Sequence, residues 1–312
     1  MQLTSRELMC KTSYVLDHLI ARTNDTTPIL ISGFWRSGTT WVQEVLAQSI
    51  GAKTLFEPLD PSSFLPLHDG CPVESSAHIP LFQDVFNTED LRLLDLSFSG
   101  ISPKRSGFNY LCRRSLSESL RKKVVIKLVR GQFLIPFLAD RYALSTVLHI
   151  SRHPMAVAYS MLRTNWKWHI KDVDFGQIYA KESQLELPHT QREIFGTLLS
   201  FRNETPERKI AALWALSERF AYEQEHVKGF KYESLLQNPI SGFTEIANTI
   251  NQPIIADIKS DKATVVSESD RTNIDMSTRL NSWQTKLTAQ QQSDIKAVLM
   301  EIWPDVIDQW AL

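Results

Sequence analysis

Short apolar runs recur along the chain, and segments with helical periodicity separate them. Runs of this length, rich in β-branched residues and bounded by turn residues, are typical of strands in a parallel sheet that is buried on both faces. The runs lie at residues 28–31, 53–56, 123–129, 145–151 and 227–232. Apolar residues recur at helical spacing over residues 5–22, 41–50, 155–163, 206–226 and 243–250. The alternation predicts an α/β fold with a central parallel β-sheet flanked by helices, and it leaves the strand order open.

A proline-rich stretch, residues 57–107, lacks regular periodicity. A structureless span of this length is uncommon in a compact domain unless it covers a site. We therefore expect short helices there, such as 88–96, folded over an active site, and a second covering segment over about 164–205. Three aromatic residues in these segments, Phe64, Trp166 and Trp168, suit either an aromatic-lined ligand pocket or the core.

The last part of the chain combines a polar stretch with a helix-start signal. Residues 267–281 are polar, which predicts a loop. Thr288 and Gln291 have the spacing of a capping box, so a last helix is expected to begin there. Pro304 is expected to interrupt that helix.

Composition narrows the class of protein. The 312 residues, 43 % of them hydrophobic, are enough for a large core, and a net charge of −1 provides no positive field for nucleic acid or an anionic membrane. Three separated cysteines, Cys10, Cys71 and Cys112, favour a reducing compartment over a disulfide framework. No run approaches the roughly 20 apolar residues of a spanning helix, and the first residues lack a secretory pattern. These features predict a soluble, cytoplasmic protein.

A glycine-containing loop, Gly33 to Trp41 (GFWRSGTTW), connects the first predicted strand to a helix. Free N–H groups at a helix N-terminus, together with the helix dipole, attract phosphate or sulfate. The loop nearly matches the signature G-x-x-x-x-G-K-[ST], with both glycines and Thr40 in register. Thr39 replaces the lysine that reaches the β- and γ-phosphates of a triphosphate, and the loop's cation is Arg36. The pattern predicts an anion site and argues against a nucleoside triphosphate.

A second strand-to-helix junction follows residue 151. It reads Arg152-His153-Pro154, with the proline suited to the first helical position, and Ser160 lies along the helix. An arginine fork and a hydroxyl can bind a dianionic phosphate, whereas a single arginine at a strand end is usually solvated or paired. Lys127, near the end of another strand, either points into a ligand crevice or extends along the strand end to solvent.

These motifs resemble those of the sulfotransferases that use 3′-phosphoadenosine 5′-phosphosulfate (PAPS). Arg36 to Trp41 looks like the family's 5′-phosphosulfate loop, and Arg152 with Ser160, eight residues later, resembles its 3′-phosphate motif. The segments KYESLLQNP at 231–239 and SWQTKLT at 282–288 are similar to the family's Tyr-Glu-Asp-Leu stretch and closing tryptophan segment. The matches follow the family's order over about residues 28–290.

The resemblance implies a single domain over residues 1–312, with a five-stranded parallel sheet related to that of P-loop nucleotide kinases. It implies PAPS as the donor, PAP (adenosine 3′,5′-bisphosphate) as the product nucleotide, and no metal. The implied ligands of the 5′-phosphosulfate are Arg36, Ser37, Gly38, Thr39 and Thr40. Those of the 3′-phosphate are Arg152 and Ser160, and Trp41 and Tyr232 are implied to lie near the adenine.

The implied chemistry is in-line transfer of a sulfuryl group to a hydroxyl or amine of a small molecule, glycan or lipid. Negative charge builds on the leaving oxygen, so fixed cations there stabilise the transition state. Arg36 would act electrostatically, and Lys127, whose place resembles the family's strand lysine, could also protonate that oxygen. An acceptor hydroxyl needs a general base, typically worth about 10²–10⁴-fold in rate.

The sequence departs from the cytosolic members of the family at the residue that acts as the general base. Their catalytic histidine corresponds to Val129 here. Glu57, in a Phe-Glu-Pro-Leu segment like that of carbohydrate sulfotransferases, is our candidate base, and the alternative is a surface or capping glutamate. Further candidates are His68, His78 and His169, each of which also suits an ordinary loop position.

A second departure concerns the 3′-phosphate. The Arg-Lys-Gly stretch expected before the closing tryptophan is missing, and Arg279 is the nearest cation that can replace it.

Two other classes of function stay open at this point. One is a P-loop kinase of a small molecule, and the other is a non-catalytic protein that binds PAP or another nucleotide.

Overall fold

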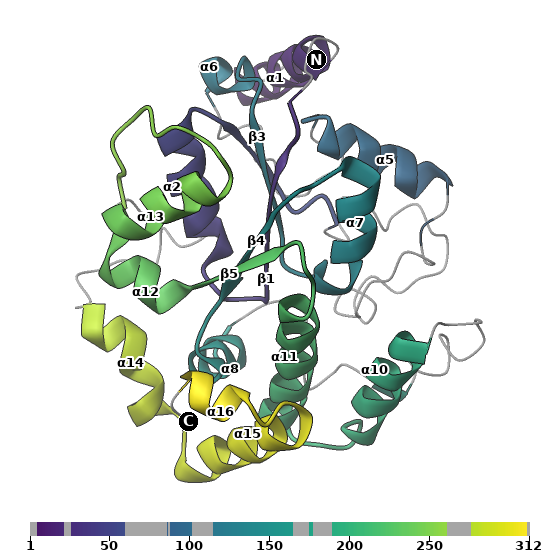
Figure 1. The fold of residues 1–312 in the computed structure, drawn as a ribbon, viewed down its shortest axis with the longest axis vertical. Coiled ribbons are helices and arrows are strands. Elements are labelled where there is room, and N and C mark those ends of the chain that lie inside the picture. Colours follow the sequence, from purple (N-terminus) through teal and green to yellow (C-terminus); the bar gives the residue numbers. More distant parts are fainter. Residues whose placement is uncertain are drawn as a thin grey trace.

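Five strands form one parallel sheet in the computed structural model, which describes residues 5–21, 26–59, 86, 88–101, 115–164, 175–176, 189–260 and 276–310. The strands are β1 (Ile29–Gly33), β2 (Lys53–Phe56), β3 (Val124–Leu128), β4 (Val147–Ser151) and β5 (Val227–Lys231). Their order across the sheet is β2-β3-β1-β4-β5, and every neighbouring pair is parallel (Figure 1). The predicted α/β fold with a central parallel sheet is therefore confirmed.

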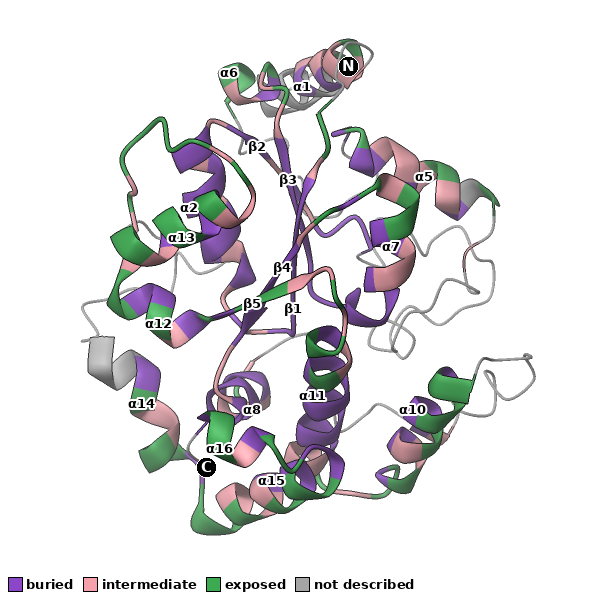
Figure 2. Cartoon of the chain, in the orientation of Figure 1, coloured by how far each residue is buried: buried purple, intermediate pink, exposed green. Residues whose placement is uncertain are grey.

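Alternation of side chains along β1 shows why its first three residues, Ile29 to Ile31, are all apolar. Ile29 and Ile31 pack in one cluster with residues of α2, α12 and α13, whereas Leu30 packs in another with residues of α5 and α7. Successive side chains of a strand point to opposite faces, so a strand covered by helices on both sides favours apolar residues on both faces. Figure 2 shows these central strands as buried, and Figure 1 shows the two groups of helices on opposite sides of the sheet.

The helices around the sheet begin and end as follows. Before β4 they are α1 (Ser5–Ala21), α2 (Thr39–Ile50), α5 (Thr88–Phe98), α6 (Leu116–Ser119), the 3₁₀ turn η4 (Gln132–Leu134) and α7 (Ile135–Tyr142). After β4 they are α8 (Pro154–Leu162), α10 (His189–Ser200), α11 (Pro206–Tyr222), α12 (Tyr232–Gln237), α13 (Pro239–Thr249), α14 (Met276–Lys286), α15 (Ala289–Ile302) and α16 (Val306–Trp310). No helix in these described parts is both long and apolar enough to cross a bilayer.

The C-terminal helices partly correct the sequence-based expectation. The capping box is confirmed: Gln291 N–H donates to Thr288 Oγ1 at 3.1 Å, and Thr288 N–H donates to Gln291 Oε1 at 3.0 Å. The predicted loop over 267–281 is wrong for residues 276–281, which begin α14. Leu280 is buried in the cluster that contains Trp41, so tertiary packing stabilises a helix whose polar sequence gives no such signal.

Candidate active site

The loop between β1 and α2 forms a cradle of backbone N–H groups. Gly38 caps α2 with φ of 84°, and Arg36 also has a left-handed backbone, with φ of 66°. The first helical bond runs from Val42 N–H to Gly38 O at 3.1 Å, so the amides of residues 38–41 point out of the helix end. A non-glycine residue in this backbone region stores strain and is a common feature of ligand-binding loops. The loop can therefore bind an anion through its backbone.

Close packing around the two loop glycines leaves no room for a side chain. A Cβ at Gly33 would lie 2.5 Å from Thr39 Cγ2 and 2.6 Å from the carbonyl oxygen of Ile150. A Cβ at Gly38 would lie 2.3 Å from the ring of Tyr232, which therefore packs directly on the loop. Strand β4 and the start of α12 are thus in contact with the anion cradle.

The two strand-to-helix junctions singled out in the sequence meet at one edge of the sheet. Arg36 Nε donates to Ser160 Oγ at 2.8 Å, and Arg152 Nη1 donates to the carbonyl oxygen of Arg36 at 3.0 Å. The Arg152 guanidinium lies 5.0 Å from the centre of the Tyr232 ring. This juxtaposition follows from the topology, because β1 and β4 are parallel neighbours with their carboxyl ends together.

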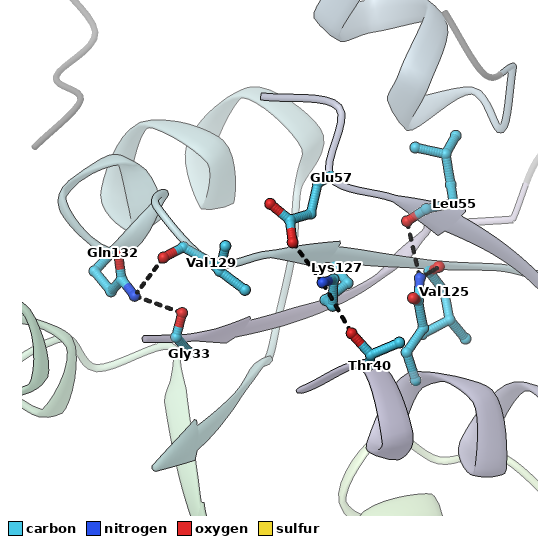
Figure 3. Close-up of polar contacts among 9 residues, drawn as sticks. Gly33, Thr40, Leu55, Glu57, Val125, Lys127, Val129 and Gln132 are labelled. Atoms are coloured by element: carbon cyan, nitrogen blue, oxygen red, sulfur yellow. Dashed lines mark hydrogen bonds and ion pairs between the residues drawn. The ribbon is translucent and has the colours of Figure 1, made fainter. Parts of the chain in front are cut away.

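A buried ion pair lies on the other side of the cradle. Lys127 Nζ is 2.5 Å from Glu57 Oε1 and 3.1 Å from Thr40 Oγ1 (Figure 3). Its ammonium also lies 3.7 Å from the centre of the Phe56 ring. Only 2 % of the Lys127 side chain and 11 % of the Glu57 side chain are exposed. Of the two orientations that the sequence left open for Lys127, the structure has the one directed at the loop.

The backbone of Glu57 is also held in an uncommon conformation. Its φ is 38°, and its N–H donates to the carbonyl oxygen of Lys127 at 3.0 Å, which extends the pairing of β2 with β3 by one residue. In Figure 3 the second oxygen of the carboxyl group points away from Lys127. The geometry therefore leaves one carboxylate oxygen directed away from the ion pair.

Two glutamines that the sequence analysis did not single out hold the loop and its helix in place. Gln132 Nε2 donates to the carbonyl oxygen of Gly33 at 2.6 Å (Figure 3). Gln43 Nε2 donates to the carbonyl oxygens of Leu55 and Val125, at 2.8 Å each, and so ties α2 to β2 and β3. Both side chains are buried, and neither position carries a periodic or motif signal that distinguishes it from an ordinary core residue.

Arg152 is followed by a histidine held between aromatic rings. The His153 ring stacks on Trp283 with centroids 4.5 Å apart and meets Trp310 edge-on at 5.8 Å. Its backbone N–H donates to Glu233 Oε1 at 3.0 Å. Burial lowers the pKa of His153 to about 4, and the charges of Arg152 and Lys231 act in the same direction. Burial raises the pKa of Glu233, against the effect of the hydrogen bond from His153.

The remaining predicted residues differ in how far they are described. Trp41 is buried, donates from Nε1 to the carbonyl oxygen of Ser260 at 3.0 Å, and meets the rings of Tyr232 and Phe243 edge-on. Arg279 belongs to α14, but its side chain lies outside the described part of the structure. Six further candidates lie entirely outside the described residues: His68, His78, His169, Phe64, Trp166 and Trp168.

The fold and the site together define an α/β protein with a P-loop-like anion cradle that has an arginine and lacks the triphosphate-binding lysine. A sequence profile described as the Sulfotransferase family matches residues 28–255. The chain therefore belongs to the Sulfotransferase family, and the resemblance noted in the sequence is confirmed. A search of curated proteins found no match.

Solved structures of sulfotransferases are similar in outline. The sulfotransferase domain from the Synechococcus PCC 7002 olefin synthase is 17 % identical, with 89 % of this chain and 95 % of that chain covered and a TM-score of 0.45. A sulfotransferase from Alicyclobacillus acidocaldarius is 15 % identical, with 88 % and 96 % covered and a TM-score of 0.37. Sulfotransferase STF9 from Mycobacterium avium is 14 % identical, with 97 % and 82 % covered and a TM-score of 0.41.

Proposed function

We propose that this sulfotransferase uses PAPS as its donor and transfers the sulfuryl group to a hydroxyl or amine of a small molecule, glycan or lipid. One observation carries the proposal: Arg36 of the loop donates to Ser160, and Arg152 donates to the backbone of Arg36. Two motifs more than a hundred residues apart in sequence therefore adjoin, as is required by a donor whose ribose carries a phosphate at the 3′ position and a phosphosulfate at the 5′ position.

The residues of the cradle fit such a donor. The outward amides of residues 38–41 suit the oxygens of the 5′-phosphosulfate, and the buried hydroxyl of Ser37 has no partner among the described residues. Arg152 and Ser160 are the ligands that we assign to the 3′-phosphate. Thr39, in place of a lysine, is consistent with a phosphosulfate rather than a triphosphate.

The chemistry assigned to the site is an in-line displacement at sulfur. A bond forms between the acceptor atom and sulfur, the bond from sulfur to the bridging oxygen breaks, and that oxygen leaves with the electron pair as part of PAP. Arg36 and Lys127 stabilise the charge that develops on the leaving oxygen, because they are fixed cations beside the loop. The guanidinium of Arg36 keeps N–H groups on its terminal nitrogens while Nε donates to Ser160.

Glu57 is the base that we assign to the acceptor's proton. Its Oε1 contacts Lys127, so the pair keeps the carboxylate next to the loop, while the other oxygen is directed away from Lys127. We also assign acceptor recognition to the two segments 57–107 and 164–205, within a single domain over residues 1–312. Val129, at the position of the histidine base of cytosolic relatives, is buried in the core and has no titratable group.

Donor binding and transfer can be tested separately. In thermal melts without magnesium, PAP at 100 times its dissociation constant should stabilise the protein by about 2.7 kcal/mol. Radiolabelled PAPS incubated with pools of phenols, glycans and lipids should then yield a labelled acceptor. Stabilisation by Mg-ATP in preference to PAP would instead indicate a kinase, and binding of PAP without transfer to any pool would indicate a non-catalytic protein.

A further inference from the structure

Glu233 occupies a position between the donor cradle and the C-terminal helices. It lies in the first turn of α12, directly after Tyr232, the residue whose ring packs on Gly38. Its Oε1 accepts the hydrogen bond from His153, and its Oε2 is also shielded from solvent. A buried carboxylate needs compensating contacts, so this contact is a substantial part of what holds the side chain there.

The N–H that Glu233 accepts belongs to the peptide group joining Arg152 to His153. A hydrogen bond to this N–H restrains the orientation of the planar peptide group, and so restrains the backbone from which the Arg152 side chain leaves. The side chain of His153 is held as well, because its ring is stacked on Trp283 and faces Trp310. Both the peptide N–H and the side chain of His153 therefore have fixed partners directly after β4.

The side chain of Arg152 is oriented by the residue next to Glu233. Its guanidinium lies over the Tyr232 ring at 5.0 Å and donates to the carbonyl oxygen of Arg36 at 3.0 Å. An unconstrained arginine has many rotamers, and ordering it on binding a ligand reduces affinity. The first two residues of α12 therefore act on Arg152 together, one on its peptide group and one on its guanidinium.

We propose that Glu233 is a positioning residue for the 3′-phosphate of the donor: it holds the Arg152–His153 peptide so that the Arg152 guanidinium is already aimed before the nucleotide arrives. Glu233 itself does not contact the phosphate, whose negative charge it would repel. The inference rests on the proposed function, in which Arg152 binds the 3′-phosphate.

The test compares two nucleotides that differ only in the 3′-phosphate. Isothermal titration calorimetry measures dissociation constants for PAP and for adenosine 5′-phosphate, and the constant for adenosine 5′-phosphate divided by that for PAP is the ratio that reports how much the 3′-phosphate contributes. Glu233→Ala should reduce this ratio at least tenfold and leave the constant for adenosine 5′-phosphate within twofold of wild type. Glu233→Gln should keep the ratio within threefold or increase it, since an amide oxygen still accepts the N–H and the repelling charge is gone.

Two further variants separate positioning from general damage. Glu118→Ala is the matched control, because Glu118 Oε2 also accepts a backbone N–H, that of Ser115 at 2.9 Å, in α6 beside α1 and away from the cradle (Figure 1). Its ratio should equal that of wild type. Arg152→Ala should reduce the ratio, and adding Glu233→Ala to it should reduce the ratio no further, because Glu233 acts through Arg152.

Each outcome has a defined meaning. If Arg152→Ala reduces the ratio but Glu233→Ala does not, the inference is wrong and the proposed donor site stands. If Arg152→Ala leaves the ratio unchanged, the 3′-phosphate is bound elsewhere and the proposed donor site is wrong. Three other results would each overturn the positioning role. They are additive effects of Arg152→Ala and Glu233→Ala on the ratio, equal losses of affinity for both nucleotides in Glu233→Ala, and a ratio for Glu233→Gln as low as that for Glu233→Ala. If Glu233→Ala does not fold, Glu233→Asp takes its place with an expected loss of at least threefold, and an unchanged ratio refutes the inference.

Discussion

Replacing Lys127 by methionine removes an ammonium from the buried pair and keeps a side chain of similar length. Glu57 then loses the partner that lies 2.5 Å away while remaining nearly inaccessible to solvent. Removing one member of a buried ion pair costs about 3–5 kcal/mol, because the other charge is left without compensation. Unfolding entropy of about 2.1 cal/mol/K per residue over 312 residues amounts to about 0.65 kcal/mol/K. The expected fall in melting temperature is therefore about 5–8 °C.

The double variant Lys127→Met/Glu57→Gln separates the fold from the chemistry. It replaces both charges by neutral groups of similar size, and such replacements of a buried pair are close to neutral for stability. Its melting temperature should return to within about 3 °C of wild type. Its turnover should not return, because the loss of Lys127 is expected to lower kcat by about 10²–10³-fold and the loss of a base by about 10²–10⁴-fold.

The assay pairs thermal melts with transfer of labelled sulfate from saturating PAPS to the acceptor identified by screening. Recovery of kcat together with the melting temperature in the double variant would show that the pair acts only in the fold. A change of less than 1 °C for Lys127→Met would show that the ion pair contributes little to stability and would refute the magnitude derived from its burial.

Further substitutions test the loop and its surroundings. Arg36→Ala should abolish transfer while leaving the fold intact, and a variant that keeps more than a tenth of the wild-type rate would remove Arg36 from the catalytic residues. Gly38→Ala should reduce PAP binding at least tenfold, because its Cβ would meet the Tyr232 ring at 2.3 Å. The double variant Gly38→Ala/Tyr232→Gly removes that ring. It should not restore PAP binding fully, since the backbone φ of 84° stays unfavourable for alanine. The pKa of His153 is about 4 in the folded protein and about 6.5 in the unfolded chain, so the unfolded chain binds a proton first as the pH falls. The free energy of unfolding should therefore decrease by up to roughly 3 kcal/mol between about pH 6.5 and about pH 4. Chemical denaturation across this pH range should give a shallower loss for His153→Phe, which keeps the ring contact with Trp283, and an identical slope would contradict the assigned pKa.

The elements of the sheet could be predicted from the sequence because parallel strands buried on both faces have a distinctive composition. Strand β2 was predicted with the bounds that the structure has, and the other four differ by a few residues at their ends. Helix α14 could not be predicted over residues 276–281, since its stability comes from the burial of Leu280 rather than from its own sequence. The pattern of apolar residues along a segment predicts its secondary structure only from local periodicity. It does not show the contacts with distant segments that stabilise a helix such as α14.

The site was only partly predictable for a related reason. The types and spacing of Arg36, Arg152 and Ser160 indicate anion binding, but the contact between Arg36 and Ser160 depends on β1 and β4 being neighbours. The sequence leaves that order open. The hydrogen bond from His153 to Glu233 depends likewise on β5 lying next to β4, and a single glutamate in a helix start carries no signal of its partner.

The strand order divides the site into two flanks around the loop of β1. Glu57 follows β2 and Lys127 lies in β3 on one side, whereas Arg152 and Glu233 follow β4 and β5 on the other. Ligands of open α/β sheets bind where the order changes direction, which here is the position of β1 between β3 and β4. The acid–base chemistry proposed for one flank and the 3′-phosphate recognition proposed for the other should then be separable by kinetics.

Variants on the two flanks should accordingly change different constants. Glu57→Gln should lower kcat by about 10²–10⁴-fold and change the dissociation constant of PAP by less than about threefold, because the role proposed for the carboxylate is on the acceptor and not on the donor. Glu233→Ala should weaken PAP binding and leave kcat at saturating PAPS within about threefold of wild type, since a correctly bound donor still meets Arg36 and Lys127. Steady-state rates and calorimetry on the same preparations measure both constants. If Glu57→Gln weakened PAP binding as strongly as Glu233→Ala, the carboxylate would have to act on the donor, and its assignment as the base would be wrong.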